Sequence, residues 1–210
     1  QVAEGMKYLH NLNPPVVHAD IRGANILVTN DLCCCLADFG LSLLAESQTL
    51  NSSSRMSKGS IRWLAPEYID PHAVIDRAYI AARDIYAYGC TVVEIFTGKP
   101  PFSDIKNEAA VIHMVMAGKF PPRPQHLLQD GLWSLVMACL TASPSQRPIA
   151  EQVPKVLVGE IKSMKGGSIT MYVLSRILNL ERIRLYTTTS MSRYYHYGAT
   201  LQRARYVPHL

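Results

Sequence analysis

The stretch "VVHADIRGAN", residues 16–25, gathers His18, Asp20 and Asn25 into one loop. A pair of prolines precedes it and ends the helix that apolar residues at helical spacing predict over residues 1–13. The loop therefore places an imidazole, a carboxylate and an amide close together, directly after a helix.

A small hairpin is predicted after this loop. The segments "NILV" (25–28) and "CCCLADF" (33–39) have the composition of short strands with a turn between them. The second segment leads into Asp38, Phe39 and Gly40, and Gly40 permits the backbone turn that aims the Asp38 carboxylate. A second carboxylate thus follows the loop one hairpin later.

These polar residues match the needs of phosphoryl transfer. That reaction needs a carboxylate to accept the proton of the incoming hydroxyl, and oxygen ligands to hold Mg²⁺ against the phosphates. Asp20 fits the base, and Asn25 and Asp38 fit the metal ligands. An Asp-Phe-Gly triplet alone occurs often by chance, whereas the ordered set is specific.

The rest of the pattern is mainly helical. Residues 78–96 are apolar nearly all round, which predicts a buried central helix that Gly98 ends. Further helices are expected at residues 108–118 and 132–140. Residues 42–60 hold eight Ser or Thr and predict a long mobile loop.

Composition indicates one soluble domain and a basic tail. The chain has 210 residues, of which 48% are hydrophobic. Residues 1–159 carry a net charge of −1 and residues 160–210 a net charge of +6, so the basic character belongs to the tail. The five cysteines fit no disulfide or zinc pattern, which favours buried thiols in a reducing compartment. No signal peptide opens the chain and no run of about eighteen apolar residues could span a bilayer, so we expect a cytoplasmic protein.

Taken together, these motifs resemble the C-terminal, catalytic lobe of the eukaryotic protein kinases. "H-A-D-I-R-G-A-N" resembles the family's H-R-D-L-K-x-x-N, and "ADFGLS" (37–42) matches its metal-binding strand end. Three later segments continue the resemblance, which is strongest to the tyrosine-kinase-like group of Ser/Thr kinases: "GSIRWLAPEY" (59–68), "RDIYAYGCTVVEIFTGKPPF" (83–102) and "CLTASPSQRP" (139–148). The resemblance implies a mainly α fold at residues 1–158, a helical bundle with a small β-hairpin that carries the catalytic and metal-binding loops.

The resemblance implies ATP and Mg²⁺ as cofactors and a protein Ser/Thr hydroxyl as the substrate, with no nucleic-acid or membrane partner. Asp20 would be the catalytic base, and Asn25 and Asp38 would hold the magnesium nucleotide, all three in one cleft open to solvent. Arg22 stands where the family has a lysine that contacts the transferred phosphate. Ser60 stands where a threonine beside the base marks Ser/Thr kinases.

Structural roles are implied for five further residues. Glu67 should pair with Arg147, and Asp84 should hold the backbone of the catalytic loop. His18 is expected to be a packed, hydrogen-bonded core histidine, and Gly40 supplies the turn after Asp38.

Two departures from the family limit what the resemblance implies. Ala19 stands where most members have an arginine that pairs with a phosphate on the activation loop, which argues against that way of ordering the loop. The glycine-rich lid, strand lysine and helix glutamate of the family's N-terminal lobe do not occur in these 210 residues. Three interpretations follow: a Ser/Thr kinase represented by its catalytic lobe and inactive alone, a kinase-like binding or scaffold module, or a truncated gene product.

Residues 159–210 match no part of the family. Pro154, one turn into the expected last helix, should disrupt it at a cost of about 3 kcal/mol. Within the tail, residues 169–185 have apolar residues near helical spacing with basic ones between them. This segment could be a helix that binds a partner or a membrane surface, a packed extension of the domain, or a non-native readthrough.

Overall fold

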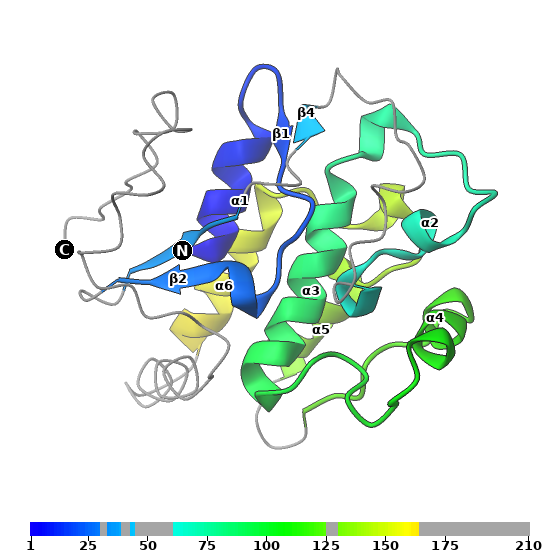
Figure 1. Ribbon diagram of the computed structural model, residues 1–210. Helices are drawn as coiled ribbons and strands as arrows, with labels where there is room; N and C mark the ends of the chain where they lie inside the picture. The colour runs from blue at the N-terminus through cyan, green and yellow to red at the C-terminus, as the bar shows by residue number, and fades with distance from the viewer. Residues whose placement is uncertain (30–32, 39–42, 45–60, 125–129, 164–210) are drawn as a thin grey trace.

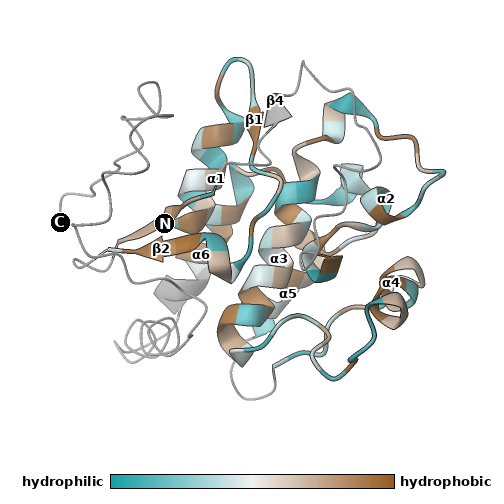
Figure 2. Cartoon of the chain, in the orientation of Figure 1, coloured by the Kyte–Doolittle hydropathy of each residue, from teal (hydrophilic) through white to brown (hydrophobic). Residues whose placement is uncertain are grey.

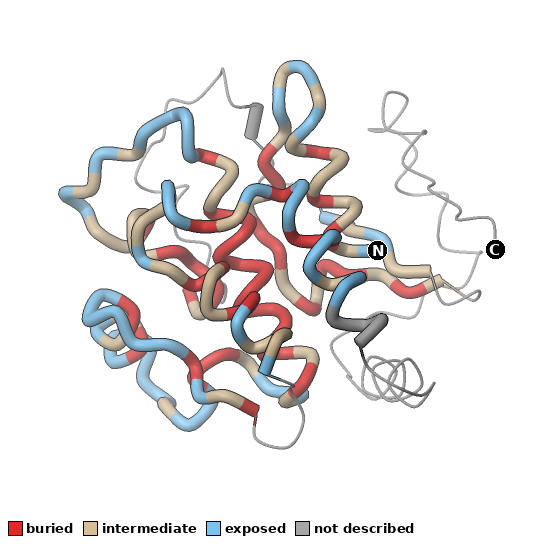
Figure 3. The backbone as a smooth tube through the Cα atoms, turned by 180° about the vertical axis from the view of Figure 1, so that it is seen from behind, coloured by how far each residue is buried: buried red, intermediate tan, exposed pale blue. Residues whose placement is uncertain are grey.

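Helix α3, Ala82–Thr97, lies at the centre of the computed structural model (Figure 1). Thirteen of its sixteen residues are buried, and the tube in Figure 3 shows this central segment in red. It ends at Gly98, whose φ of 69° lies in the left-handed region that glycine adopts without strain. The sequence predicted this helix and its end. Its expected start at residue 78 is wrong, because Arg77–Tyr79 form a separate 3-10 turn.

The structure describes residues 1–29, 33–38, 43–44, 61–124 and 130–163. Gly40, Ser60, most of the expected 42–60 loop and the tail after residue 163 lie outside the described residues.

Five further helices accompany α3 in the part of the chain that the structure describes. They are α1 (Val2–His10), α2 (Pro66–Ile69), α4 (Glu108–Met116), α5 (Asp130–Cys139) and α6 (Gln152–Ser163). Helix α5 packs on α3 and on α6, α1 packs on α6, and α2 packs on α4. Helices α3 and α5 approach closely at Gly89, where a Cβ atom would lie 2.9 Å from the Cβ of Cys139.

Two short antiparallel strand pairs lie beside α1. Strand β2 (Ile26–Val28) pairs with β3 (Cys34–Leu36), and Leu27 is opposite Cys35. This is the predicted hairpin, and its apolar residues appear brown in Figure 2. The second pair joins β1 (Val16–Val17) to β4 (Leu43–Leu44), and no feature of the sequence predicted it.

Helix α6 continues through the expected domain boundary at residue 158 and ends at Ser163. Pro154 is its third residue and therefore lies in the first turn, where a backbone N–H has no partner within the helix. The expected disruption by Pro154 is wrong for this reason.

The cysteines differ in burial. Cys90 and Cys139 are buried, as predicted, whereas Cys33 and Cys34 are only partly buried and Cys35, in β3, is exposed, so the expected burial of the thiols holds only in part. The described residues include no helix with the length and apolar character needed to cross a membrane.

Candidate active site

The loop that carries Asp20 is anchored by Asp84, in the first turn of α3. The Asp84 carboxylate accepts hydrogen bonds from the backbone N–H groups of His18 and Ala19, each at 2.8 Å. The Nε2 atom of His10 lies 2.8 Å from the same carboxylate. Burial opposes ionisation, but the hydrogen bond and charge of His10, together with the His18 ring and the backbone donor, hold the pKa of Asp84 below its ordinary value. Asp84 is thus an ionised anchor for this backbone.

His18 connects the loop to the end of β3. Its side chain is fully buried, and Nε2 lies 3.0 Å from the carbonyl oxygen of Ala37. Its Nδ1 accepts a 3.3 Å hydrogen bond from the backbone N–H of Asp20. His18 is therefore a packed, hydrogen-bonded histidine that sets the position of Asp20 relative to Asp38, the residue after Ala37.

Asn25 and Asp20 are held directly to each other. The Nδ2 atom of Asn25 donates to the backbone oxygen of Asp20 and to its Oδ2 atom, both at 2.8 Å. Asp20 is 8% exposed and Asn25 is 4% exposed. The expectation that these two residues lie open to solvent is wrong, because the Asn25 amide folds over the Asp20 carboxylate. Both bonds use Nδ2 of Asn25. Its Oδ1 atom accepts no hydrogen bond from the residues that the structure describes.

Asp38 is the exposed member of the set. It follows β3 with a φ of 63°, in the left-handed region that aspartate tolerates better than most residues. Its neighbour Ala37 donates its N–H to the backbone oxygen of Asn25 at 2.9 Å and accepts from His18. The end of β3 is therefore tied to the loop at two points, and Asp38 lies next to both.

Arg22 lies beside the same carboxylate. Its Nε atom is 3.4 Å from Oδ2 of Asp20, and its side chain is half-buried. Arg22 thus places a positive charge next to Asp20, at the position where the resemblance puts a lysine.

Glu94 is a site residue that the sequence analysis missed. It is buried in α3, where its Oε2 accepts hydrogen bonds from the backbone N–H of Gly23 at 2.8 Å and from Nε1 of Trp63 at 3.1 Å. A Cβ atom on Gly23 would lie 3.0 Å from this carboxylate, so a side chain there would disturb the contact. A glutamate within a nearly apolar helix was the signal in the sequence.

Glu67 and Arg147 form the expected ion pair. The Arg147 guanidinium donates to both carboxylate oxygens of Glu67 at 2.7 Å, and its side chain is fully buried. It also donates to the backbone oxygens of Thr141, Ala82 and Ala142. This pair fixes α2 against the start of α3 and the segment before α6.

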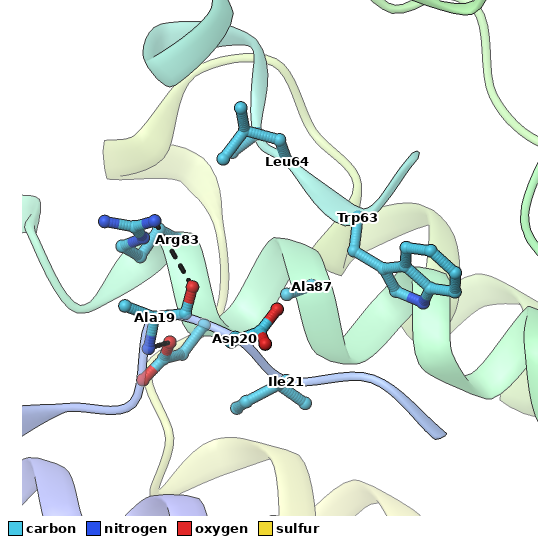
Figure 4. A pocket seen from close by; sticks show the side chains of 9 residues that line it. Ala19, Asp20, Ile21, Trp63, Leu64, Arg83 and Ala87 are labelled. Carbon is cyan, nitrogen blue, oxygen red and sulfur yellow. Dashed lines mark hydrogen bonds between the residues drawn. The ribbon is translucent and has the colours of Figure 1, made fainter. Parts of the chain in front are cut away.

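A small hollow opens beside Asp20. It has a volume of about 10 Å³, and its lining includes Ala19, Asp20, Leu64 and Arg83. Figure 4 shows the Arg83 guanidinium beside Ala19 and directed away from the Asp20 carboxylate. Arg83 Nη2 donates to the carbonyl oxygen of Ala19, which has a φ of 69°. Arg83 and Asp84 thus hold Ala19 in this left-handed conformation from both sides.

Comparisons with known proteins agree with this geometry. The family profile described as "Protein tyrosine and serine/threonine kinase" matches residues 1–157. Mitogen-activated protein kinase kinase kinase 2 of Arabidopsis thaliana is 36% identical over 177 residues, which is 82% of this chain and 26% of the relative. Mitogen-activated protein kinase kinase kinase 3 of the same plant is 40% identical over 155 residues, 73% of the chain and 22% of the relative.

A yeast protein extends the comparison further along the chain. Serine/threonine-protein kinase BCK1/SLK1/SSP31 of Saccharomyces cerevisiae is 31% identical over 193 residues, 88% of this chain and 12% of the relative. The chain therefore spans about a quarter or less of the length of these relatives. On the profile match and on these identities, the chain belongs to the family of protein tyrosine and serine/threonine kinases.

Proposed function

We propose that these residues are the C-terminal lobe of a Ser/Thr protein kinase domain, which transfers the γ-phosphoryl group of ATP to a protein hydroxyl. The observation that carries the proposal is the set of hydrogen bonds that connect Asp20 and Asn25 with each other and, partly through His18, with the end of β3. These bonds bring a candidate base and two candidate magnesium ligands to one end of the hairpin.

Each residue then has a chemical task. Asp20 accepts the proton of the incoming hydroxyl, as the base of such reactions must. Asn25 orients the carboxylate of Asp20 through Nδ2. Arg22, beside Asp20, supplies positive charge for the transferred phosphate. Ser60, outside the described residues, is proposed to lie beside the base.

The donor set fits a magnesium ion. Mg²⁺ prefers oxygen ligands and is usually held by one or two carboxylates together with substrate phosphates and water. The exposed carboxylate of Asp38 and the unused Oδ1 of Asn25 are ligands of this kind. Within the described residues no group of three or more His, Cys, Asp or Glu could hold a metal ion by itself. When bound, the ion would neutralise charge on the nucleotide phosphates, which would have to complete its coordination.

The names of the relatives suggest the substrate class. Several are mitogen-activated protein kinase kinase kinases, and the names describe enzymes that act on another protein kinase. The exposed position of Asp38 suits a protein substrate approaching from outside. We therefore propose a cytoplasmic signalling kinase with a protein kinase among its substrates.

A second candidate is a kinase-like binding module without chemistry. The burial of Asp20 and Asn25 favours it, because a carboxylate bonded to an amide and beside Arg22 is less available as a base. Nucleotide binding alone does not separate the candidates, whereas transfer of phosphate does.

The test uses the full-length natural protein with Mg-ATP and a Ser/Thr protein substrate. Asp20→Asn should lower kcat by about 10²- to 10⁴-fold, the usual contribution of a positioned base. Asp38→Asn should raise the magnesium concentration needed for half-maximal rate. The matched control is Asp104→Asn, an exposed aspartate away from the loop, which should leave both quantities unchanged. Full activity of Asp20→Asn would refute the proposal, and absence of transfer by the natural protein would favour the binding module.

A further inference from the structure

Arg62 connects two segments of the domain that are far apart in the sequence. It lies in the half-buried 3-10 turn Ile61–Trp63, and its guanidinium donates to the backbone oxygens of Pro101, Phe102 and Ile105, at 3.0, 2.7 and 2.7 Å. These three carbonyls belong to the loop between α3 and α4. Because a guanidinium presents its donors in a rigid planar fork, the contact fixes the direction of this loop as well as its distance from the turn.

Phe102 shows that this loop is held under strain. It has a φ of 54°, in the left-handed region, and it is 3% exposed. A residue with a bulky side chain adopts such a backbone only where its surroundings hold it there. Arg62 bonds to the carbonyl oxygen before Phe102 and to that of Phe102 itself, and the N–H of Ile105 donates to the latter at 2.9 Å. The fork of Arg62 therefore supports the strained residue directly.

The residues that follow Arg62 form one wall of the hollow beside Asp20. This wall consists of Trp63, Leu64 and Ala65, and Figure 4 shows Trp63 and Leu64 across from the loop that carries Asp20. The 3-10 turn packs on α3, where Nε1 of Trp63 donates to Glu94, and on α4. The hollow, at about 10 Å³, has room for one water-sized group, which is also the size of a hydroxyl. A hydroxyl that reaches the Asp20 carboxylate through the hollow must therefore pass along this wall.

We propose that Arg62 is a positioning residue for the protein substrate, which holds the wall where a substrate hydroxyl can enter the hollow. The inference rests on the proposed transfer of phosphate to protein. Arg62 acts through the loop and the wall, because its hydrogen bonds within the described residues go to none of the proposed base and metal ligands, Asp20, Asn25 and Asp38. Its loss should therefore weaken the binding of protein substrate and leave nucleotide binding unchanged.

The experiment compares Arg62→Gln with the wild-type form of the full-length natural protein. It measures kcat and KM for a Ser/Thr protein substrate, KM for Mg-ATP, and the rate of ATP hydrolysis without protein substrate. Arg62→Gln should raise KM for the protein substrate about tenfold and lower kcat less than about threefold, since the lost interaction positions the substrate before the reaction. KM for Mg-ATP and the rate of hydrolysis should change less than about twofold, because water does not need the wall to reach the phosphate.

Further variants connect the effect to the guanidinium fork. Arg62→Lys keeps the charge without the fork, so its KM for the protein substrate should rise only about threefold. The matched control is Arg123→Gln, which removes another half-buried arginine, one that pairs with Asp130, and should change this KM less than about twofold. Hydrogen exchange provides a readout that does not depend on activity. The Ile105 amide should exchange faster in Arg62→Gln, because the carbonyl that it bonds to loses its support.

The outcomes separate this inference from the proposed function. Absence of transfer by the wild-type protein would overturn both. Normal transfer by the wild type, with equal KM values for the protein substrate in Arg62→Gln and Arg123→Gln, would overturn the role of Arg62 alone. Equal losses of ATP hydrolysis and of transfer to protein in Arg62→Gln would also overturn it, because they would indicate general damage to the site. If Arg62→Gln does not fold, Arg62→Lys decides: a raised KM supports the role, and an unchanged KM overturns it.

Discussion

The two sides of the Asp20 loop differ in how completely their polar groups are bonded. Behind the loop, Asp84 receives three donors and Arg147 makes a bidentate ion pair and three carbonyl contacts. In front of it, Asn25 keeps a spare acceptor and Asp38 is exposed. The difference indicates that the rear of the loop is built for stability, whereas the front keeps unused polar groups, to which the proposed function assigns the nucleotide, the metal ion and the hydroxyl.

The same contrast separates the two arginines that are buried among the described residues. Arg147 is surrounded by acceptors, including both oxygens of Glu67, while Arg83 has one carbonyl and one aromatic ring. The extensively bonded Arg147 is therefore part of the framework that holds α2 against the start of α3.

The largest expected effect concerns the rate of phosphoryl transfer that the residues at the front of the loop can support alone. The 210 residues tested alone should not phosphorylate protein at a useful rate, compared with about 1–100 per second for complete kinases. Most of the acceleration beyond the base comes from holding the phosphates in line and neutralising them. These residues contain no glycine-rich lid and no strand lysine for that task. We expect ATP affinity no better than millimolar, worth about −4 kcal/mol.

The measurement is a transfer assay with Mg-ATP and a generic Ser/Thr substrate. Asp20→Asn in the same chain is the control for a contaminating kinase. Turnover near one per second that Asp20→Asn abolishes would show that the front of the loop is sufficient without a lid.

The second prediction concerns the ion pair between Arg147 and Glu67, which belongs to the framework behind the loop. Arg147→Ala should lower the free energy of unfolding by about 3–5 kcal/mol, because it leaves Glu67 as an unpaired, nearly buried charge. The matched control is Arg123→Ala. Arg123 pairs with Asp130 at the surface, and such pairs contribute about 0–1 kcal/mol. Equal melting temperatures for Arg147→Ala and the wild-type chain would contradict the framework role.

Sequence reasoning was most successful for this framework. Glu67 and Arg147 are eighty residues apart, and only the resemblance to a family could join them, since no local pattern does. The buried central helix and the hairpin followed from apolar periodicity. The start of α3 was wrong because residues 78–81 are as apolar as the helix, and only backbone geometry separates them from it.

The front of the loop was harder to predict. The residue types of Asp20, Asn25 and Asp38 indicated the chemistry, but their exposure depends on the direction in which the Asn25 amide points. The roles of Glu94 and Arg83 depend on tertiary contacts of α3 with Gly23 and Ala19, and no spacing in the sequence records such contacts.

The third prediction concerns the anchor Asp84. Its pKa in the folded chain lies below the ordinary value of 3.8, so the unfolded chain binds its proton more readily. The stability that Asp84 contributes is present above pH 3.8 and is lost as pH falls through the folded-state pKa. Asp84→Asn should therefore cost about 1–3 kcal/mol at pH 7, and the difference from wild type should shrink toward pH 3. Denaturant unfolding at several pH values measures this, with the exposed Asp104→Asn as control. A difference that stays constant over this range would contradict an ionised anchor.

The smallest expected effect concerns the C-terminal tail. The family profile ends at residue 157, but α6 continues to Ser163, and the yeast match covers 88% of the chain and so extends beyond residue 158. We still expect the tail to contribute little to the core, because the charge changes sharply after residue 159. Removing residues 164–210 should change the free energy of unfolding by less than about 0.5 kcal/mol, the usual range for changes outside the packed structure.

A second truncation separates the contribution of α6 to stability from that of the tail. Removing residues 152–210 also deletes α6, with the fully buried Val153 and the partly buried Leu157 that packs against the core. Full burial of one such side chain contributes about 1.5–3 kcal/mol, so this shorter chain should lose at least about 2 kcal/mol. Denaturant titration of the three lengths gives both differences in one series. If the first truncation costs as much as the second, residues 164–210 pack on the domain, and the framework behind the loop extends further along the chain than α6.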